Sequence, residues 1–451
     1  MRTLTRAISR IQVTRLFGSY DYDLHPASQG SDLDRLWILY GDNGCGKTTI
    51  LETLFHLLAP ENNRGHRTAV ASTPFGRFEV TLSSGERVWA ERSGTRVIGT
   101  FSIGLKLKGK KAVVQEYVAN EEGDIVVLSP EAESESLRFL TALRELDVGL
   151  FLLSDDRTVR LAGRNNRETP FTRSQLLGNE ERILRARRAQ HGPGMNPEDL
   201  KRSATLLLAD SMKRAEGWIR SQAVHSSSEG ELNVNALYAD ILKTVSNLAL
   251  GMDSEPERTV AEIGRRVDSL EKRSRQFAQY GLSPKFTGRD ILTAVKNTPE
   301  THLNIMKSVV ESYIDSVAKK LDAMAPLQRQ VDALVTTLNS FFTPKSLSFE
   351  LRSGFHISAV GGGELSPDML SSGERHLLLL FLSTLVALDK PSIFIIDEPE
   401  ISLNIKWQRR LLESLLECAG ESPIQYLFAT HSLELLSQHR DNAIRFTEAT
   451  D

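Results

Sequence analysis

The chain has 451 residues, of which 40% are hydrophobic, so it can bury a substantial core spread over two or three domains. A formal net charge of -3 excludes a globally basic surface, and any binding to nucleic acid or membranes would need a local patch. The two cysteines, Cys45 and Cys418, are too few and too far apart for a disulfide framework, which favours a reducing compartment.

The N-terminal residues, MRTLTRAISRIQV, carry charges throughout and lack the uninterrupted apolar stretch of a signal peptide. The longest apolar run covers 377–388, which is too short to span a bilayer and contains Ser383 and Thr384. We therefore expect a buried helix there and a cytoplasmic protein with no membrane partner.

A glycine-rich loop follows the apolar run 36–40 and precedes a helical pattern over 50–58. The stretch YGDNGCGKTT fits G-x-x-x-x-G-K-[ST], a motif whose backbone N–H groups converge on the phosphates of a nucleotide. Lys47 supplies positive charge, Thr48 offers its hydroxyl to Mg²⁺, and the helix N-terminus adds its dipole. The sequence thus predicts ATP and Mg²⁺, with the nucleotide-binding residues Asn43, Gly44, Cys45, Gly46, Lys47, Thr48 and Thr49.

A second apolar strand, 393–396, ends in the acids of IIDEPE. Strands that are buried on both faces are typical of parallel sheets, where ligands lie at the carboxyl ends. We expect Asp397 to hold Mg²⁺ opposite Thr48, and Glu398 to take a proton from the attacking water. Structural acids at a strand end are the alternative for either residue alone.

A third apolar stretch, QYLFATHS, leads to His431. From a neighbouring strand end this histidine can reach the γ phosphate and help to fix the water, so we expect it to be catalytic. A histidine without chemistry is the alternative.

The segment DMLSSGERHLLLL places Ser371 and Gly373 at the start of the expected apolar helix. A helix that begins at such a turn offers hydroxyls, free N–H groups and its dipole to an anion. The alternative is a simple helix cap in which Ser372 and Glu374 act locally.

The order of these motifs resembles the ATP-binding-cassette (ABC) superfamily, in particular its SMC and RecF-like branch. LSSGERHLLLLFL, IIDEPEISLNIKWQRRLLESL and FATHS are most similar to OLD-type ATPases and to the anti-phage ATPases of the PARIS and Septu systems. The opening ISRIQVTRLFGSYDY is similar to the first strand of that group. The resemblance covers roughly the first 160 and the last 110 residues.

The resemblance implies an ATPase in which Ser371 and Gly373 cap the γ phosphate of ATP bound by a second copy. A homodimer or a larger even-numbered assembly would then complete two sites. Where the family often has a histidine, this chain has Asn404, and no glutamine loop follows the phosphate-loop helix. Asp155 or Arg157 is the candidate to sense Mg²⁺ or water instead.

The predicted fold class is α/β: an ABC-type P-loop ATPase head with an antiparallel β lobe and a helical insertion. Residues 1–170 are expected to form lobe I, with short strands between 75 and 128. Residues 341–451 are expected to form lobe II. Between them, 171–340 should be helical, in one form a coiled-coil hairpin, with seams of intramolecular packing or dimer contact at Val260, Ile263, Val267, Leu270, Val310, Ile314, Val317, Leu321 and Met324.

One segment departs from the weakly acidic composition. Between Arg157 and Arg188 nine arginines stand against three acids. This cluster could contact nucleic acid or an acidic partner, and a solvated face explains it about as well.

The motifs favour an ATP-dependent switch, and the resemblance implies that it acts as sensor or scaffold in an anti-phage defence system. Only 20 residues follow His431, too few for the Toprim nuclease of OLD-type proteins, so we expect a separate nuclease effector. DNA or a phage protein are further candidate partners. The alternatives are a RecF-like DNA repair ATPase that binds DNA ends or junctions, and a nucleotide-gated scaffold with negligible turnover.

Overall fold

The computed structural model describes two compact units, one within 1–207 and 387–451 and the other within 208–386. The signature turn, Leu370–Glu374, belongs to the second unit, whereas Asp397 and His431 belong to the first. The described residues are 6–26, 35–61, 65–120, 125–126, 130–155, 159–163, 205–227, 256–299, 302–437 and 439–446.

The first unit contains a six-stranded sheet in the order β10-β9-β14-β15-β3-β16. Its strands are β3 (Leu36–Tyr40), β9 (Gly149–Leu153), β10 (Val159–Ala162), β14 (Ser392–Asp397), β15 (Ile424–Thr430) and β16 (Ala443–Arg445). All neighbours are parallel except the edge strand β10. Every residue of β14 and β15 is buried, as expected for central strands that are covered on both faces.

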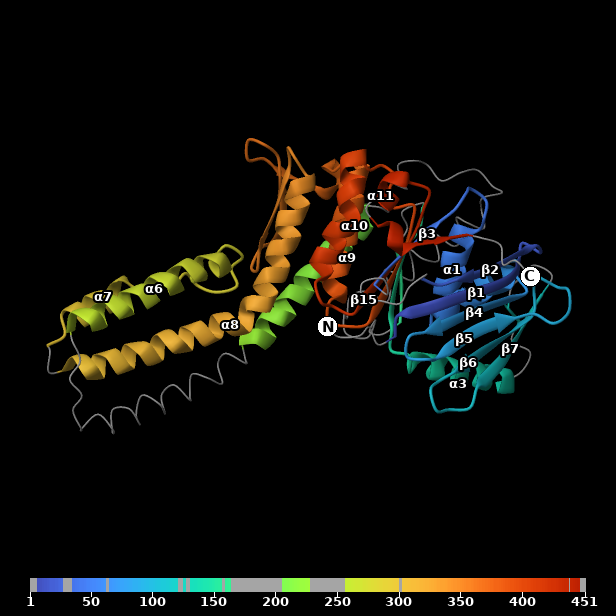
Figure 1. Cartoon of the computed structure of the whole chain (residues 1–451), viewed down its shortest axis with the longest axis horizontal. Helices are drawn as coiled ribbons and strands as arrows, with labels where there is room; N and C mark the ends of the chain where they lie inside the picture. The colour runs from blue at the N-terminus through green and yellow to red at the C-terminus, as the bar shows by residue number, and fades with distance from the viewer. Residues whose placement is uncertain are drawn as a thin grey trace. The chain divides into compact units, whose positions relative to one another are not determined.

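A seven-stranded antiparallel sheet forms the second layer of this unit (Figure 1). Its order is β2-β1-β4-β5-β6-β7-β8, so the first strand of the chain lies inside it. The strands are β1 (Ile8–Leu16), β2 (Tyr20–Leu24), β4 (Arg77–Leu82), β5 (Arg87–Glu91), β6 (Phe101–Lys106), β7 (Val113–Ala119) and β8 (Ile125–Val126).

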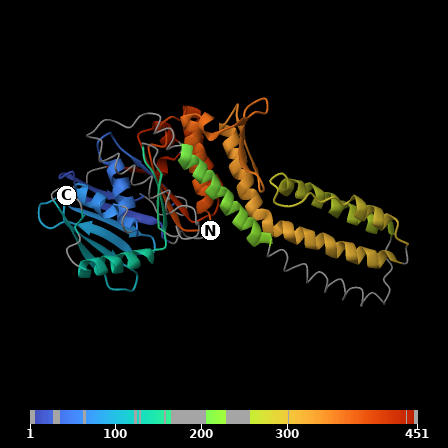
Figure 2. The same ribbon diagram turned by 180° about the vertical axis from the view of Figure 1, so that it is seen from behind.

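Helix α1 (Lys47–Leu58) contacts strands of both sheets. Its apolar side chains therefore join the two sheets in one hydrophobic core. Helix α2 (His66–Ser72) packs on α1, and α3 (Pro130–Arg144) lies against β6 and β7 (Figure 2). Among its described residues, the unit also has α10 (Ile405–Ala419), α11 (Leu433–Ser437) and the short η4 (Arg440–Asn442). The predicted α/β class, with a mixed sheet and an antiparallel lobe, is confirmed.

The second unit is mainly helical. Its elements are a helix over 205–227, α6 (Pro256–Ala278), α7 (Arg289–Lys296), α8 (Leu303–Phe341), β11 (Ser346–Glu350), β12 (Gly354–Ser358), β13 (Glu364–Leu365), η3 (Pro367–Met369) and α9 (Ser372–Ala387). The three strands form one small antiparallel sheet. Within the described part of the chain, none of the helices combines the length and apolarity that a membrane crossing requires.

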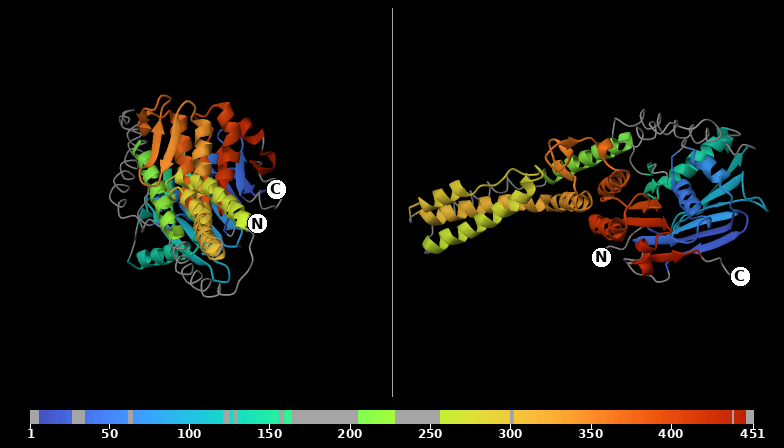
Figure 3. Two further views of the ribbon diagram at one scale, coloured as in Figure 1. Left: turned by 90° about the vertical axis from the view of Figure 1, so that its left-hand side faces the viewer. Right: turned by 90° about the horizontal axis from the view of Figure 1, so that it is seen from above.

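Helices α6 and α8 lie side by side and run parallel (Figure 3). Arg266 pairs with Asp315 and Arg273 with Asp322, and both pairs join residues that are 49 positions apart. The two helices of a simple hairpin are antiparallel. Here α6 and α8 are parallel, and residues 279–288 and α7 connect the end of α6 to the start of α8. The predicted seam residues Ile263, Val267, Leu270, Val310, Ile314, Leu321 and Met324 are buried, whereas Val317 is half-buried.

The arginine cluster between 157 and 188 lies outside the described residues, except for Arg160. Arg160 lies against α1, with a guanidinium nitrogen 3.2 Å from His56 Nε2 and 3.9 Å from the Glu52 carboxylate. A role for the rest of the cluster therefore stays a prediction.

Candidate functional site

The phosphate loop, residues 41–48, connects β3 to α1. Gly44 and Gly46 have φ angles of 87° and 95°, a left-handed conformation that favours glycine. Helix α1 begins at Lys47, and no side chain caps the N–H groups of its first turn. Lys47 is 6% exposed, and its Nζ donates to the carbonyl oxygens of Gly41 at 2.7 Å and Asp42 at 3.0 Å. The loop thus offers backbone N–H groups and the Lys47 ammonium to a phosphate.

Close packing around the loop explains two of its glycines. A Cβ on Gly41 would lie 2.9 Å from the Cys45 sulfur, and one on Gly46 would lie 2.6 Å from Leu16. Cys45 is a free, half-buried cysteine. The ring of Phe17 also borders Gly46, and it is 44% exposed. Sequence reasoning missed this exposed aromatic ring beside the phosphate loop.

Asp397 is the last residue of β14 and is 2% exposed. Neither of its carboxylate oxygens has a hydrogen-bond partner of normal geometry among the described residues. Burial raises its pKa to about 6; the Thr48 hydroxyl lowers the pKa and the nearby charges of Asp155 and Glu52 raise it. A buried carboxylate beside a hydroxyl matches the oxygen ligands that Mg²⁺ prefers. Thr48 and Asp397 therefore fit the predicted metal pair, and Asp155 lies near them.

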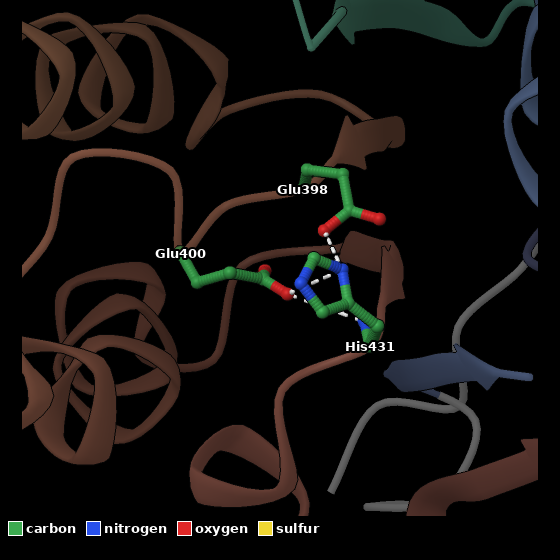
Figure 4. A group of neighbouring side chains, drawn as sticks. All are labelled: Glu398, Glu400 and His431. Carbon is green, nitrogen blue, oxygen red and sulfur yellow. Dashed lines mark hydrogen bonds and ion pairs between the residues drawn. The ribbon is translucent and has the colours of Figure 1, made fainter. Parts of the chain in front are cut away.

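Glu398 and His431 meet at the ends of the neighbouring strands β14 and β15 (Figure 4). His431 Nδ1 lies 2.6 Å from a Glu398 carboxylate oxygen. Burial raises the pKa of Glu398 to about 7, partly offset by the hydrogen bond with His431. The same hydrogen bond raises the pKa of His431. A carboxylate with a pKa near neutrality suits a general base.

Glu400 is a third member of this group that sequence reasoning did not single out. It is 7% exposed and accepts hydrogen bonds from the Thr430 hydroxyl and from the backbone N–H groups of His431 at 3.2 Å and Ser432 at 3.1 Å. Its carboxylate also lies 3.6 Å from His431 Nδ1, the same ring nitrogen that contacts Glu398 (Figure 4). Glu400 therefore holds the switch loop, Thr430–Ser432, and the third acid of DEPE was the available signal.

Glu398, Glu400 and His431 bring their ligand atoms within 4.8 Å of one another, a spacing that could also hold a metal ion. Hydrogen bonding accounts for most of this proximity. His431 is already paired with Glu398, and Glu400 Oε1 accepts three donors of the switch loop. The buried, unpaired carboxylate of Asp397 is the better match to Mg²⁺.

The signature turn lies in the second unit, at the start of α9. The N–H of Ser371 donates to Glu374 Oε2 at 2.6 Å, and the N–H of Glu374 donates to the Ser371 hydroxyl at 3.3 Å. This reciprocal capping box makes Ser371 the cap of α9, one residue before Ser372 of the local alternative. Gly373 lies buried in the first turn. Because the Ser371 oxygen accepts the internal bond, its hydroxyl proton remains able to bind an anion.

Asn404 has a structural explanation in place of the family's histidine. It is the N-cap of α10, and its side chain accepts a hydrogen bond from the Trp407 N–H at 3.0 Å. Arg157 lies outside the described residues, which leaves Asp155 as the predicted sensor near Asp397.

Comparison with curated proteins finds two partial sequence relatives. The DNA double-strand break repair Rad50 ATPase of Sulfurisphaera tokodaii is 23% identical over 164 residues, 36% of this chain and 18% of that protein. The uncharacterized ABC transporter ATP-binding protein YejF of Escherichia coli is 34% identical over 70 residues, 16% of this chain and 13% of that protein. The chain thus spans less than a fifth of either relative, and both relatives support a P-loop ATPase class.

Among solved structures, the chain is similar to the Smc head domain with an extended coiled coil bound to the C-terminal domain of ScpA, from Pyrococcus furiosus. The identity is 12%, the TM-score is 0.37, and the match covers 98% of this chain and 95% of that one. For the SMC head domain from Thermotoga maritima the identity is 12%, the TM-score is 0.33, and 96% and 91% are covered. The fold assignment itself rests on the strand order and the phosphate loop.

A protein-family model described as "AAA domain, putative AbiEii toxin, Type IV TA system" matches residues 201–437. This range is just over half of the chain and includes the signature turn, Asp397, Glu398 and His431. The chain therefore belongs to this family of AAA domains.

Proposed function

We propose that the protein is an ABC-type ATPase whose two copies close on ATP and whose closed state controls a separate effector. One observation carries this proposal. The phosphate loop, Asp397, Glu398 and His431 all lie at the carboxyl ends of three adjacent parallel strands, β3, β15 and β14. Ligands of open α/β sheets bind at this edge.

Each residue at these strand ends has a separate role in ATP hydrolysis. Residues 43–49 bind the phosphates of ATP through backbone N–H groups, with Lys47 as the counter-charge. Thr48 and Asp397 would hold Mg²⁺, which would supply positive charge against the phosphates. Glu398 takes a proton from the attacking water, and His431, fixed by Glu400, orients that water and contacts the γ phosphate.

Ser371 and the Gly373 N–H complete the site of a second copy. The chain's phosphate loop and signature turn occur once each, so two copies supply two composite sites. The capping box supports this role because it fixes the Ser371 hydroxyl at a helix N-terminus. ATP then acts as a bridge, and the assembly opens after hydrolysis.

For the biological setting we propose an anti-phage defence system in which this subunit restrains a toxic nuclease. The family description, a putative toxin of a type IV toxin–antitoxin system, supports a role near toxic effectors. The Rad50 relative supports the second candidate, a DNA repair ATPase. The neighbouring genes separate the two: an adjacent nuclease gene favours defence, whereas adjacent replication or repair genes favour repair.

The shared site is tested by mixing two inactive variants. Ser371→Arg keeps its own phosphate loop but blocks its signature turn, and Lys47→Ala has the opposite defect. Mixed dimers contain one complete site, built from the loop of the first variant and the signature of the second. We expect ATP hydrolysis to return in the mixture, measured as phosphate release.

The matched control mixes Lys47→Ala with the double variant that carries both changes, in which no loop is intact and no activity should return. Crosslinking in the presence of ATP verifies that mixed dimers form. If they form and remain inactive at every mixing ratio, the composite site is contradicted.

A further inference from the structure

Lys345 braces the signature turn from the segment that precedes β11. Its Nζ donates to Glu374 Oε2 at 2.8 Å and to the carbonyl oxygen of Met369 at 3.0 Å. One side chain thus contacts the chain on both sides of Ser371. Glu374 is 6% exposed, so its pair with Lys345 is shielded from solvent on the carboxylate side.

Glu374 places a negative charge beside the group that is expected to meet a phosphate. Burial favours its neutral form, but hydrogen bonds from Lys345 and Ser371 outweigh burial and lower its pKa. The side chain is therefore a carboxylate, and its Oε2 accepts both the Ser371 N–H and the Lys345 ammonium. Without Lys345 this buried charge would repel an incoming phosphate.

The position of Lys345 is fixed by its neighbours in the chain. Asn339, in the last turn of α8, accepts from the Leu347 N–H at 2.6 Å and donates to the Leu347 carbonyl oxygen at 2.9 Å. These two bonds tie the end of α8 to the start of β11. Lys345 lies in the short segment between Asn339 and Leu347, so these bonds anchor its backbone beside the signature turn.

We propose that Lys345 is a positioning residue that neutralises Glu374 and fixes Ser371, so that the signature turn accepts the γ phosphate of ATP held by a second copy. The inference rests on the proposed function, because it concerns the same composite site. In this proposal the Lys345 ammonium favours binding of the second copy's ATP indirectly, through Glu374 and Ser371.

The test compares Lys345→Met with the double variant Lys345→Met/Glu374→Gln. We expect the ATP concentration for half-maximal dimerisation, measured by analytical ultracentrifugation, to rise about tenfold to a hundredfold in Lys345→Met. Titration of dilute monomer with a fluorescent ATP analogue should show unchanged binding at its own phosphate loop. The double variant should dimerise at close to the wild-type ATP concentration, because glutamine preserves the capping box without the charge.

The control variant Lys319→Met changes an exposed lysine of α8 and should behave as wild type. If Lys345→Met dimerises normally, or if the double variant is as defective as Lys345→Met, the proposed role of Lys345 is overturned while the composite site stands. If the unaltered protein shows no ATP-dependent dimer at all, the proposed function fails, and this inference fails with it.

Discussion

The strand ends of the first unit and the signature turn of the second both carry buried carboxylates, but their electrostatics are opposite. Asp397 has no hydrogen-bond partner of normal geometry among the described residues, and burial raises its pKa to about 6. Glu374 is paired with Lys345 and Ser371, and these bonds lower its pKa. Among the described residues no cation forms a salt bridge with Asp397, although the charge of Lys47 lowers its pKa, whereas Glu374 has Lys345 as a direct partner.

This difference indicates which region depends on ligand. A buried, unpaired carboxylate destabilises the folded chain until a cation arrives, which is typical of a binding site. A satisfied capping box is stable without ligand and presents a prearranged surface to one. We therefore expect ATP and Mg²⁺ to change the strand ends more than the signature turn.

The largest expected effect comes from Glu398→Gln, which removes the base from the strand ends and leaves the shape. Turnover should fall about 10²-fold to 10⁴-fold, while ATP binding persists. In the unaltered protein, turnover should rise with pH through about 7, because the base must be ionised. Phosphate release and equilibrium ATP titration measure the two quantities. The exposed Glu413→Gln is the control, and wild-type turnover in Glu398→Gln would refute the assignment.

Glu400→Ala should come next, since it leaves three donors of the switch loop without their acceptor. Loss of a buried acceptor should cost about 1–3 kcal/mol in the free energy of unfolding. Displacement of His431 should lower turnover about a hundredfold. Glu400→Gln keeps one acceptor oxygen and should lose less of both. Urea unfolding and turnover are the measurements; a Glu400→Ala protein with normal turnover would remove Glu400 from the site.

The smallest expected effect is on the pH dependence of stability, to which Asp397 and Glu374 contribute with opposite sign. The folded pKa of Asp397, about 6, lies above the ordinary aspartate value of 3.8, so its contribution to stability is full below 3.8 and is lost as pH rises through about 6. For nucleotide-free protein, Asp397→Asn should remove that loss, which is about 3 kcal/mol. Glu374 has the opposite sign: its contribution is lost as pH falls below the ordinary glutamate pKa of 4.5, and Glu374→Gln should abolish that loss. Urea unfolding across this pH range should show that the two substitutions change the pH dependence of the free energy of unfolding in opposite directions, and changes of the same sign would contradict the comparison.

Local chemistry explains how much the sequence could predict. The phosphate loop and the ends of β3 and β14 were predictable, because their glycines, acids and buried strands follow one another along the chain. Glu400, Phe17 and Lys345 were not, because their partners are distant in sequence: Glu400 binds the switch loop about 30 residues away and Lys345 binds Glu374 29 residues away. The period of α6 and α8 predicted two helices but not their direction, since an apolar stripe is the same in both orientations.

The parallel arrangement of α6 and α8 gives the helix pair a directional register. Arg266 and Arg273 face Asp315 and Asp322, one heptad apart on both helices. A slip of α8 by one heptad that brought Asp322 to Arg266 would set Arg329 against Arg273, and two cations would repel. The opposite slip would bring Asp315 to Arg273 and keep one ion pair. The two ion pairs therefore oppose sliding of α8 along α6 more strongly in one direction than in the other.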